Sequence, residues 1–134
     1  MNEIRQLVKF VAATTLAVIV LSFGGRAQAQ DRLAAFMQDK LTHSEKTLEG
    51  LAKGDFELIA KHSQAISLLC EDELWAVLQT PEYLERSKEF RRNVNAITEA
   101  ARKKNLEGAT LAYVNATLNC VSCHKYLRDT KAGK

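Results

Sequence analysis

Two cysteines and a histidine near the C-terminus are the residues best suited to do chemistry. They are Cys120, Cys123 and His124, in the sequence Cys-Val-Ser-Cys-His. On a helix, positions i, i+3 and i+4 share one face, so a single turn would present two thiols and an imidazole together. Two thiols can add to the two vinyl groups of a haem, and the imidazole can ligate its iron. This spacing is the signature of covalent haem attachment. We therefore predict one haem c, bound through Cys120 and Cys123, with His124 as the proximal iron ligand.

Three other interpretations of the same residues remain. A thioredoxin-like Cys-x-x-Cys motif should begin a helix near a βαβ pattern, whereas this motif falls late in a helical segment with no strand before it. A zinc site needs four ligands, typically with a second close pair, but the other candidates, Cys70, His43 and His62, occur singly. A disulfide between the two motif cysteines would strain a regular helix. Haem attachment is the favoured interpretation.

Residues 1–29 have the pattern of an export signal. A basic start is followed by an uncharged, largely apolar run and by the small-residue cleavage pattern Ala27-Gln28-Ala29. The run is short for a membrane span, which needs about 20 residues, so we predict cleavage after Ala29 and a periplasmic protein. Retention of the segment as a membrane anchor is the alternative. Export agrees with the haem prediction, because c-type haem is attached outside the bacterial cytoplasm.

Residues 30–134 are then expected to form one small domain. The whole chain has 19 Lys and Arg against 16 Asp and Glu, a formal net charge of +3, and the balance is closer still without residues 1–29. Nothing in this balance indicates binding to nucleic acid. A core of this size is marginal by itself, and a covalently held porphyrin would add a large apolar body. We expect the protein without haem to be much less stable than the haem-loaded protein.

Apolar spacing and capping residues predict four helices. They cover about 32–51, 56–70, 81–104 and 106–127, with N-caps at Asp31, Asp55, Thr80 and Asn105. The inner stripe predicted for the first helix is Leu33, Met37, Leu41, Ser44, Leu48 and Leu51. Short connections and near-heptad stripes favour an all-α fold, an antiparallel up-down four-helix bundle with haem inside it.

The predicted topology places a candidate distal residue. In an up-down bundle the first and last helices are antiparallel neighbours, so the start of the first helix should lie beside Cys120–His124. That stretch contains Met37, the only methionine of residues 30–134. Met37 is our candidate sixth ligand of the iron. The alternative is that Met37 fills core space, as most helical methionines do, with Leu33, Phe36 or Leu41 over the iron.

The chain resembles the cytochrome c′ family in its export signal, its four helices and its single C-terminal Cys-x-x-Cys-His. Arg128 matches the arginine that the family usually carries four residues after its histidine, on the proximal side of the haem. The family's tyrosine before that arginine is replaced by Leu127, and a tyrosine stands at Tyr126 instead. The resemblance implies either five-coordinate iron that binds nitric oxide or carbon monoxide, or methionine-ligated iron suited to electron transfer. It also implies frequent dimers through the first two helices, and the sequence shows no exposed apolar seam that decides this.

Three function classes suit such a haem protein: an electron carrier, a binder of diatomic gases, and an enzyme such as a peroxidase. A peroxidase needs a distal acid–base residue, and Leu33–Leu41 contains no histidine, so we expect no enzymatic activity. Ligation by His124 and Met37 would stabilise ferrous iron and keep both ligands on in both redox states. We therefore predict electron transfer with a partner protein; the alternative is a five-coordinate binder of nitric oxide or carbon monoxide.

Several further residues receive supporting roles. Arg32 is a candidate partner for a haem propionate. Cys70 is expected to be a buried small hydrophobe, and His43 and His62 are expected to be solvated. Basic residues near the C-terminus are expected to favour an acidic redox partner; they are Lys125, Arg128, Lys131 and Lys134.

Overall fold

The computed structural model describes residues 28, 30–71 and 80–132, and the chain divides into two compact units, Met1–Met37 and Gln38–Lys134. The described residues contain four helices and no strand. They are a helix over residues 30–53, in which the division between the units falls, α2 (Phe56–Leu69), α3 (Pro81–Arg102) and α4 (Leu106–Ala132). The prediction of an all-helical chain is confirmed for these residues.

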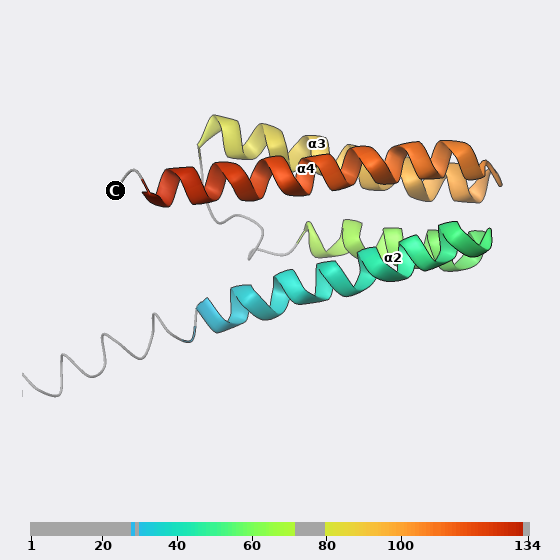
Figure 1. Ribbon diagram of the computed structural model, residues 1–134, viewed down its shortest axis with the longest axis horizontal. Helices are drawn as coiled ribbons and strands as arrows, with labels where there is room; N and C mark the ends of the chain where they lie inside the picture. The colour runs from blue at the N-terminus through green and yellow to red at the C-terminus, as the bar shows by residue number, and fades with distance from the viewer. Residues whose placement is uncertain (1–27, 29, 72–79, 133–134) are drawn as a thin grey trace, which may run out of the picture. The chain divides into compact units, whose positions relative to one another are not determined.

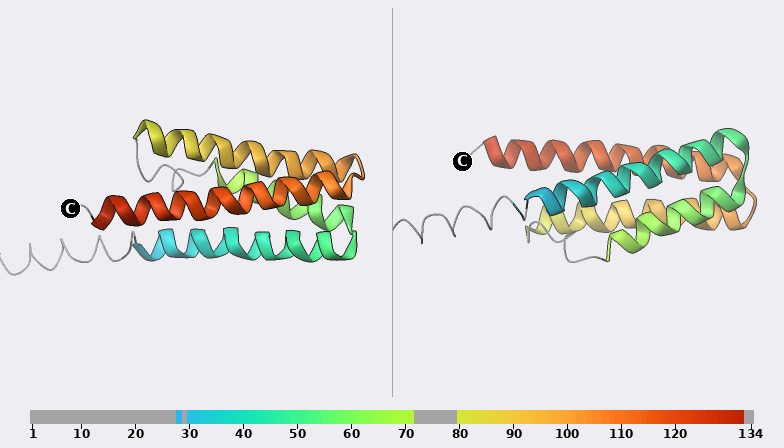
Figure 2. Two further views of the ribbon diagram at one scale, coloured as in Figure 1. Left: turned by 45° about the horizontal axis from the view of Figure 1, so that its top comes forward. Right: turned by 90° about the horizontal axis from the view of Figure 1, so that it is seen from below.

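Helices of the second unit follow one another up and down. Residues 38–53 turn back into α2, and α3 turns back into α4 at the same end of the unit (Figure 1). α3 packs against both α2 and α4. Residues 38–53 lie beside α4 (Figure 2), and a hydrogen bond of 3.2 Å between the Ser44 and Tyr113 hydroxyls joins the two. This order is that of an up-down helical bundle.

Both tight turns use the same backbone geometry. Gly54 ends one helix with φ +68°, and Lys104 follows the end of α3 with φ +55°. In each turn the next residue, Asp55 or Asn105, donates its backbone N–H to the carbonyl five residues earlier, at 2.9 Å, which is the Schellman pattern. The side chains of Asp55 and Asn105 then accept the N–H three residues onward, at 3.0 and 2.9 Å. Their predicted role as N-caps is confirmed, as is that of Thr80.

The core of the second unit lies along the inner faces of the helices. Its buried members are Leu51, Ile59, Ile66, Cys70, Phe90, Val94, Ile97, Ala101, Ala109, Ala112 and Ala116. Two buried hydroxyls, those of Ser63 and Thr98, hydrogen-bond to each other at 2.7 Å. Since the Ser63 hydroxyl also lies 2.8 Å from the Ile59 carbonyl oxygen, this polar pair is satisfied inside an apolar layer.

The predicted inner stripe of the first helix is wrong by about one residue. Leu41 and Leu48 are 50% and 52% exposed, whereas Lys40 and Thr47 are buried. Thr47 can be buried because its hydroxyl donates to a backbone carbonyl one turn earlier, at 2.9 Å. Gly50 also sets the rotation of the helix, since a Cβ there would lie 2.9 Å from the Ile59 side chain of α2.

An apolar row remains exposed on the outside of α4. It consists of Leu111, Val114, Leu118 and Val121, at spacings of three and four residues. Leu41 and Leu48 are exposed on the neighbouring helix, on either side of Ser44, which contacts Tyr113 of α4. The sequence pattern did not reveal this exposed apolar surface, because it assigned both leucines to the core.

Candidate haem-attachment site

All three motif residues lie well inside α4, fourteen or more residues after its first residue. Both cysteines are unpaired; Cys120 is exposed and Cys123 is half-buried, while His124 is exposed. A reactive dithiol of the thioredoxin kind depends on a helix N-terminus to lower its thiol pKa, and these cysteines have no such position. The structure therefore presents two accessible thiols and an imidazole within a single helical turn.

Side chains next to the motif fasten α4 to α3. Three contacts do this: Asn93 donates to Asn119 (2.5 Å), Arg86 donates to Ser122, and the hydroxyls of Thr80 and Tyr126 hydrogen-bond (2.9 Å). On α4 the contact residues are Asn119, Ser122 and Tyr126, which lie before, between and after the motif residues along the chain. They fix the rotation of α4, and so they also fix the direction in which the thiols and the imidazole point.

Lys40 is a site residue that the sequence did not identify. It is the one charged side chain among the buried residues of the described chain, only 8% exposed, and its ammonium group lies 4.2 Å from the centre of the Phe90 ring. Lys40, Cys70, Phe90 and Cys120 each lie 12 to 14 residues from the tight turns. At about 1.5 Å per residue, all four lie roughly 20 Å from the end of the bundle that carries the two tight turns. Four helical segments therefore meet at the level of the motif.

Burial and neighbouring charges shift the pKa values of Lys40 and of the motif side chains. Burial lowers the pKa of Lys40 to about 8, while the thiols of Cys70, Cys120 and Cys123, when ionised, raise it. Desolvation raises the pKa of both motif thiols, and the positive charge of Lys40 opposes this. Desolvation, followed by the charges of Lys40 and Arg128, lowers the pKa of His124. Burial and the neighbouring positive charges therefore favour the neutral imidazole, which is the form that ligates a metal.

Arg86 brings an unused hydrogen-bond donor to the same place. Its guanidinium donates to Glu82 at 2.6 Å and lies over the Tyr126 ring, 5.4 Å from the ring centre. Its Nε is buried and has no hydrogen-bond partner in the part of the chain that the structure describes. The charge of Arg86 also acts on the pKa of Cys123. A buried donor without a partner, next to the motif, is suited to an incoming carboxylate.

The remaining predicted residues fall into two groups. Arg32 is exposed and Met37 half-buried; both belong to the first unit, and their assignments as propionate partner and distal ligand stay predictions. Arg128 is exposed on α4 one turn after His124, and its charge acts on that imidazole. Nearly all of the predicted export signal, residues 1–29, lies outside the described residues.

Two expectations about single residues can be checked directly. Cys70 is 6% exposed, and its thiol donates to a backbone carbonyl at 3.2 Å, so its prediction as a buried small hydrophobe is confirmed. His43 and His62 were expected to be solvated, and this is wrong. They are half-buried, and their Nδ1 atoms lie 2.8 Å apart across two helices. Helix rotation brings them together, which their separate positions in the sequence could not show.

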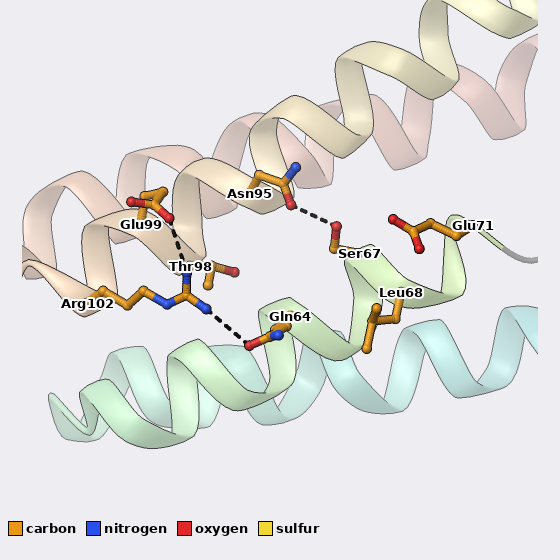
Figure 3. Close-up of a pocket in the computed structure, with 8 residues that line it drawn as sticks. All are labelled: Gln64, Ser67, Leu68, Glu71, Asn95, Thr98, Glu99 and Arg102. Atoms are coloured by element: carbon orange, nitrogen blue, oxygen red, sulfur yellow. Dashed lines mark hydrogen bonds and ion pairs between the residues drawn. The ribbon is translucent and has the colours of Figure 1, made fainter.

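A cavity of about 370 Å³ lies between α2 and α3 (Figure 3). Its lining is largely polar and includes no cysteine or histidine: Gln64, Ser67, Leu68, Glu71, Asn95, Thr98, Glu99 and Arg102. Arg102 donates to Gln64 (3.3 Å) and Glu99 (3.2 Å), as Figure 3 shows. Because α4 contributes nothing to the lining, this cavity is separate from the motif. Among the described residues, no group of three or more His, Cys, Asp or Glu side chains is arranged to hold a metal ion.

No family model matches this chain, and no curated protein or solved structure is detectably similar to it. The likeness to cytochromes c′ rests on the predicted export signal, the motif, the helix pattern and Arg128.

Proposed function

We propose that this chain is an exported mono-haem c-type cytochrome that transfers electrons through iron ligated by His124. The observation that carries the proposal is the arrangement on α4. Cys120, Cys123 and His124 share one turn with unpaired thiols, and α3 holds that turn in a fixed rotation. Two thioether bonds from this turn would fix the porphyrin edge, and the imidazole would reach its iron.

The residues present fit a haem. The donor set is two thiols and a neutral imidazole, and the buried Nε of Arg86 offers a hydrogen bond suited to a propionate. When bound, haem iron supplies one-electron chemistry between its ferric and ferrous states. The protein would hold the cofactor through Cys120 and Cys123, orient it through His124, and cover one face with apolar core.

Exposure around the motif favours electron transfer. Cys120 and His124 are exposed, so the attached edge of a haem would lie close to solvent. Exposed Leu118 and Val121 lie on the same helix, and exposed Lys125 and Arg128 follow. Small surfaces of this mixed kind suit brief encounters with an acidic redox partner.

The proposal includes export. Covalent haem attachment in bacteria takes place outside the cytoplasm, which agrees with the signal predicted in residues 1–29. Among the described residues, no helix is long and apolar enough to cross a membrane. A protein released after cleavage at Ala29 would act in the periplasm.

The first test is haem retention under denaturing conditions. The full chain is expressed in a host that attaches c-type haem, and a peroxidase stain of a denaturing gel reports covalently held haem. We expect the stain for the natural chain and for Cys70→Ser, a matched cysteine control, and none for the double variant Cys120→Ser/Cys123→Ser. Haem that stays on the double variant, or no haem on the natural chain, would overturn the proposal.

The spectrum of the purified protein then separates the two haem functions. A low-spin spectrum that carbon monoxide leaves unchanged supports electron transfer. A high-spin spectrum that shifts on adding the gas supports the second function, binding of nitric oxide or carbon monoxide.

A further inference from the structure

Lys40 lies where a haem attached to α4 would meet the first helix. Its side chain is buried, and Phe90 of α3 lies against its ammonium group, 4.2 Å away. Burying a lysine costs free energy that contacts of the amine must offset, and the Phe90 ring supplies one such contact. A lysine that only carried charge could point to water from almost any outer position of the same helix.

The direction of the side chain brings the amine toward the histidine. Side chains on a helix lean toward its N-terminus, and the first helix runs antiparallel to α4. Lys40 begins at the level of Cys120, so its long side chain leans toward the level of Cys123 and His124. Its charge acts on the pKa of Cys70, Cys120, Cys123 and His124. The amine therefore lies close enough to these side chains to interact with them electrostatically.

We propose that Lys40 is the sixth ligand of the haem iron, on the face opposite His124. This rests on the proposed function, since it needs a haem attached to α4. Ligation exchanges one proton: the ammonium group releases H⁺ to solvent, and the nitrogen lone pair binds iron. Two nitrogen ligands would then hold the iron in both redox states, and the soft sulfur that raises the potential of His/Met cytochromes would be absent.

Lys40 competes with Met37 for this role. Met37 precedes it by three residues on the same helix, and its sulfur was the sequence-based candidate. The two atoms give different spectra, because an iron–sulfur bond adds a weak charge-transfer band at the red end of the ferric spectrum and an iron–amine bond does not. The assignment can therefore be made on the ferric protein without any activity assay.

The experiment compares four haem-loaded proteins by ferric absorption and electron paramagnetic resonance: the natural chain, Lys40→Ala, Met37→Leu and Lys46→Ala. Lys46 is the matched control, an exposed lysine on the same helix. We expect low-spin iron without the sulfur band in the natural chain, in Met37→Leu and in Lys46→Ala. Lys40→Ala should become high-spin and, after reduction to the ferrous state, open to carbon monoxide.

Other outcomes overturn the proposal in distinct ways. A sulfur band that disappears in Met37→Leu assigns the ligand to methionine. A high-spin natural chain means that no side chain ligates the iron. Chains without covalent haem would overturn the proposed function itself. If Lys40→Ala does not fold, Lys40→Met keeps an unbranched side chain of similar length; it should gain the sulfur band, and a spectrum unchanged from that of the natural chain counts against Lys40.

Discussion

The imidazole rings of His43 and His62, on two different helices, lie within hydrogen-bonding distance of each other. Their Nδ1 atoms are 2.8 Å apart, which suits a hydrogen bond from one neutral ring to the other. Desolvation, and then the charge of His43, lowers the pKa of His62. The folded protein therefore resists protonation at His62 more than the unfolded chain, in which a histidine titrates near about 6.5.

This pair predicts a pH-dependent stability. Because the folded pKa lies below the unfolded value, the stabilisation is complete above about pH 6.5 and is lost as pH falls through the folded pKa. We expect the urea midpoint to drop between about pH 7 and 5, and to drop less in His62→Gln. Lys88→Gln, an exposed change elsewhere, serves as the control and should follow the natural chain. An equal drop in His62→Gln would show that other groups cause the acid sensitivity.

Single residues differ in how far the sequence could assign them. The prediction for Cys120, Cys123 and His124 rests on their spacing within one helical turn, and the structure confirms that all three lie within α4. Lys40 and Arg86 could not be assigned, since each gains its role from groups on other helices. A spacing signal for Lys40 did exist: it lies seven residues before Thr47 and eleven before Leu51, on their buried face. The signal was missed because lysine is polar, and the buried face of the helix was predicted from the spacing of its apolar residues.

Element ends were easier to predict than element rotation. The caps at Asp55, Thr80 and Asn105 follow from local chemistry, and the structure confirms them. The predicted cap at Asp31 is wrong, because that residue lies inside the helix over residues 30–53. The rotation of the first helix depended on a choice between two heptad rows one residue apart, one through Leu41 and the other through Lys40. The close approach of Gly50 to α2 selects the second row. Contacts between helices, which a single sequence does not display, made this choice.

The two tight turns offer a matched test of the backbone. Gly54 and Lys104 both have positive φ, and no atom lies within 4 Å of a Cβ built on Gly54. Gly54→Ala should therefore lose about 1 kcal/mol of unfolding free energy from backbone strain alone. Lys104→Gly should gain about 0.5 kcal/mol, because it relieves the same strain at a cost in unfolded-chain entropy. Urea unfolding measures both changes, and effects of the same sign would contradict this account.

The molecule buries several polar side chains for a protein of its size. Thr47, Ser63, Ser87, Thr98 and Lys40 all lie among its buried residues, which leaves less apolar area to stabilise the fold. The order of the helices could be predicted because short turns force antiparallel neighbours. A haem's contribution to the core could not be read in the same way, since it depends on how the cofactor packs.

If the protein holds the proposed haem, loss of that haem should lower thermal stability sharply. In Cys120→Ala/Cys123→Ala the lost side chains are themselves half-buried or exposed, so little protein packing is removed. A loss of a few kcal/mol would lower Tm by more than about 10 °C in a domain of this size. Differential scanning calorimetry of the haem-loaded and haem-free proteins measures the difference. Equal midpoints would mean that the bundle does not depend on its cofactor.

The position of the motif in the chain also sets an order of assembly. Ser44 and Tyr113, which join the first and last helices, are 69 residues apart, so their contact waits until nearly the whole chain has been made. The α3–α4 hairpin is joined by a short turn and its contacts are local, which favours its early formation. Cys120 and Cys123 can therefore be displayed on this hairpin before the helix that carries Lys40 packs beside it. If haem is attached as proposed, the chain order leaves an interval in which an attachment enzyme can reach both thiols before the first helix packs beside α4.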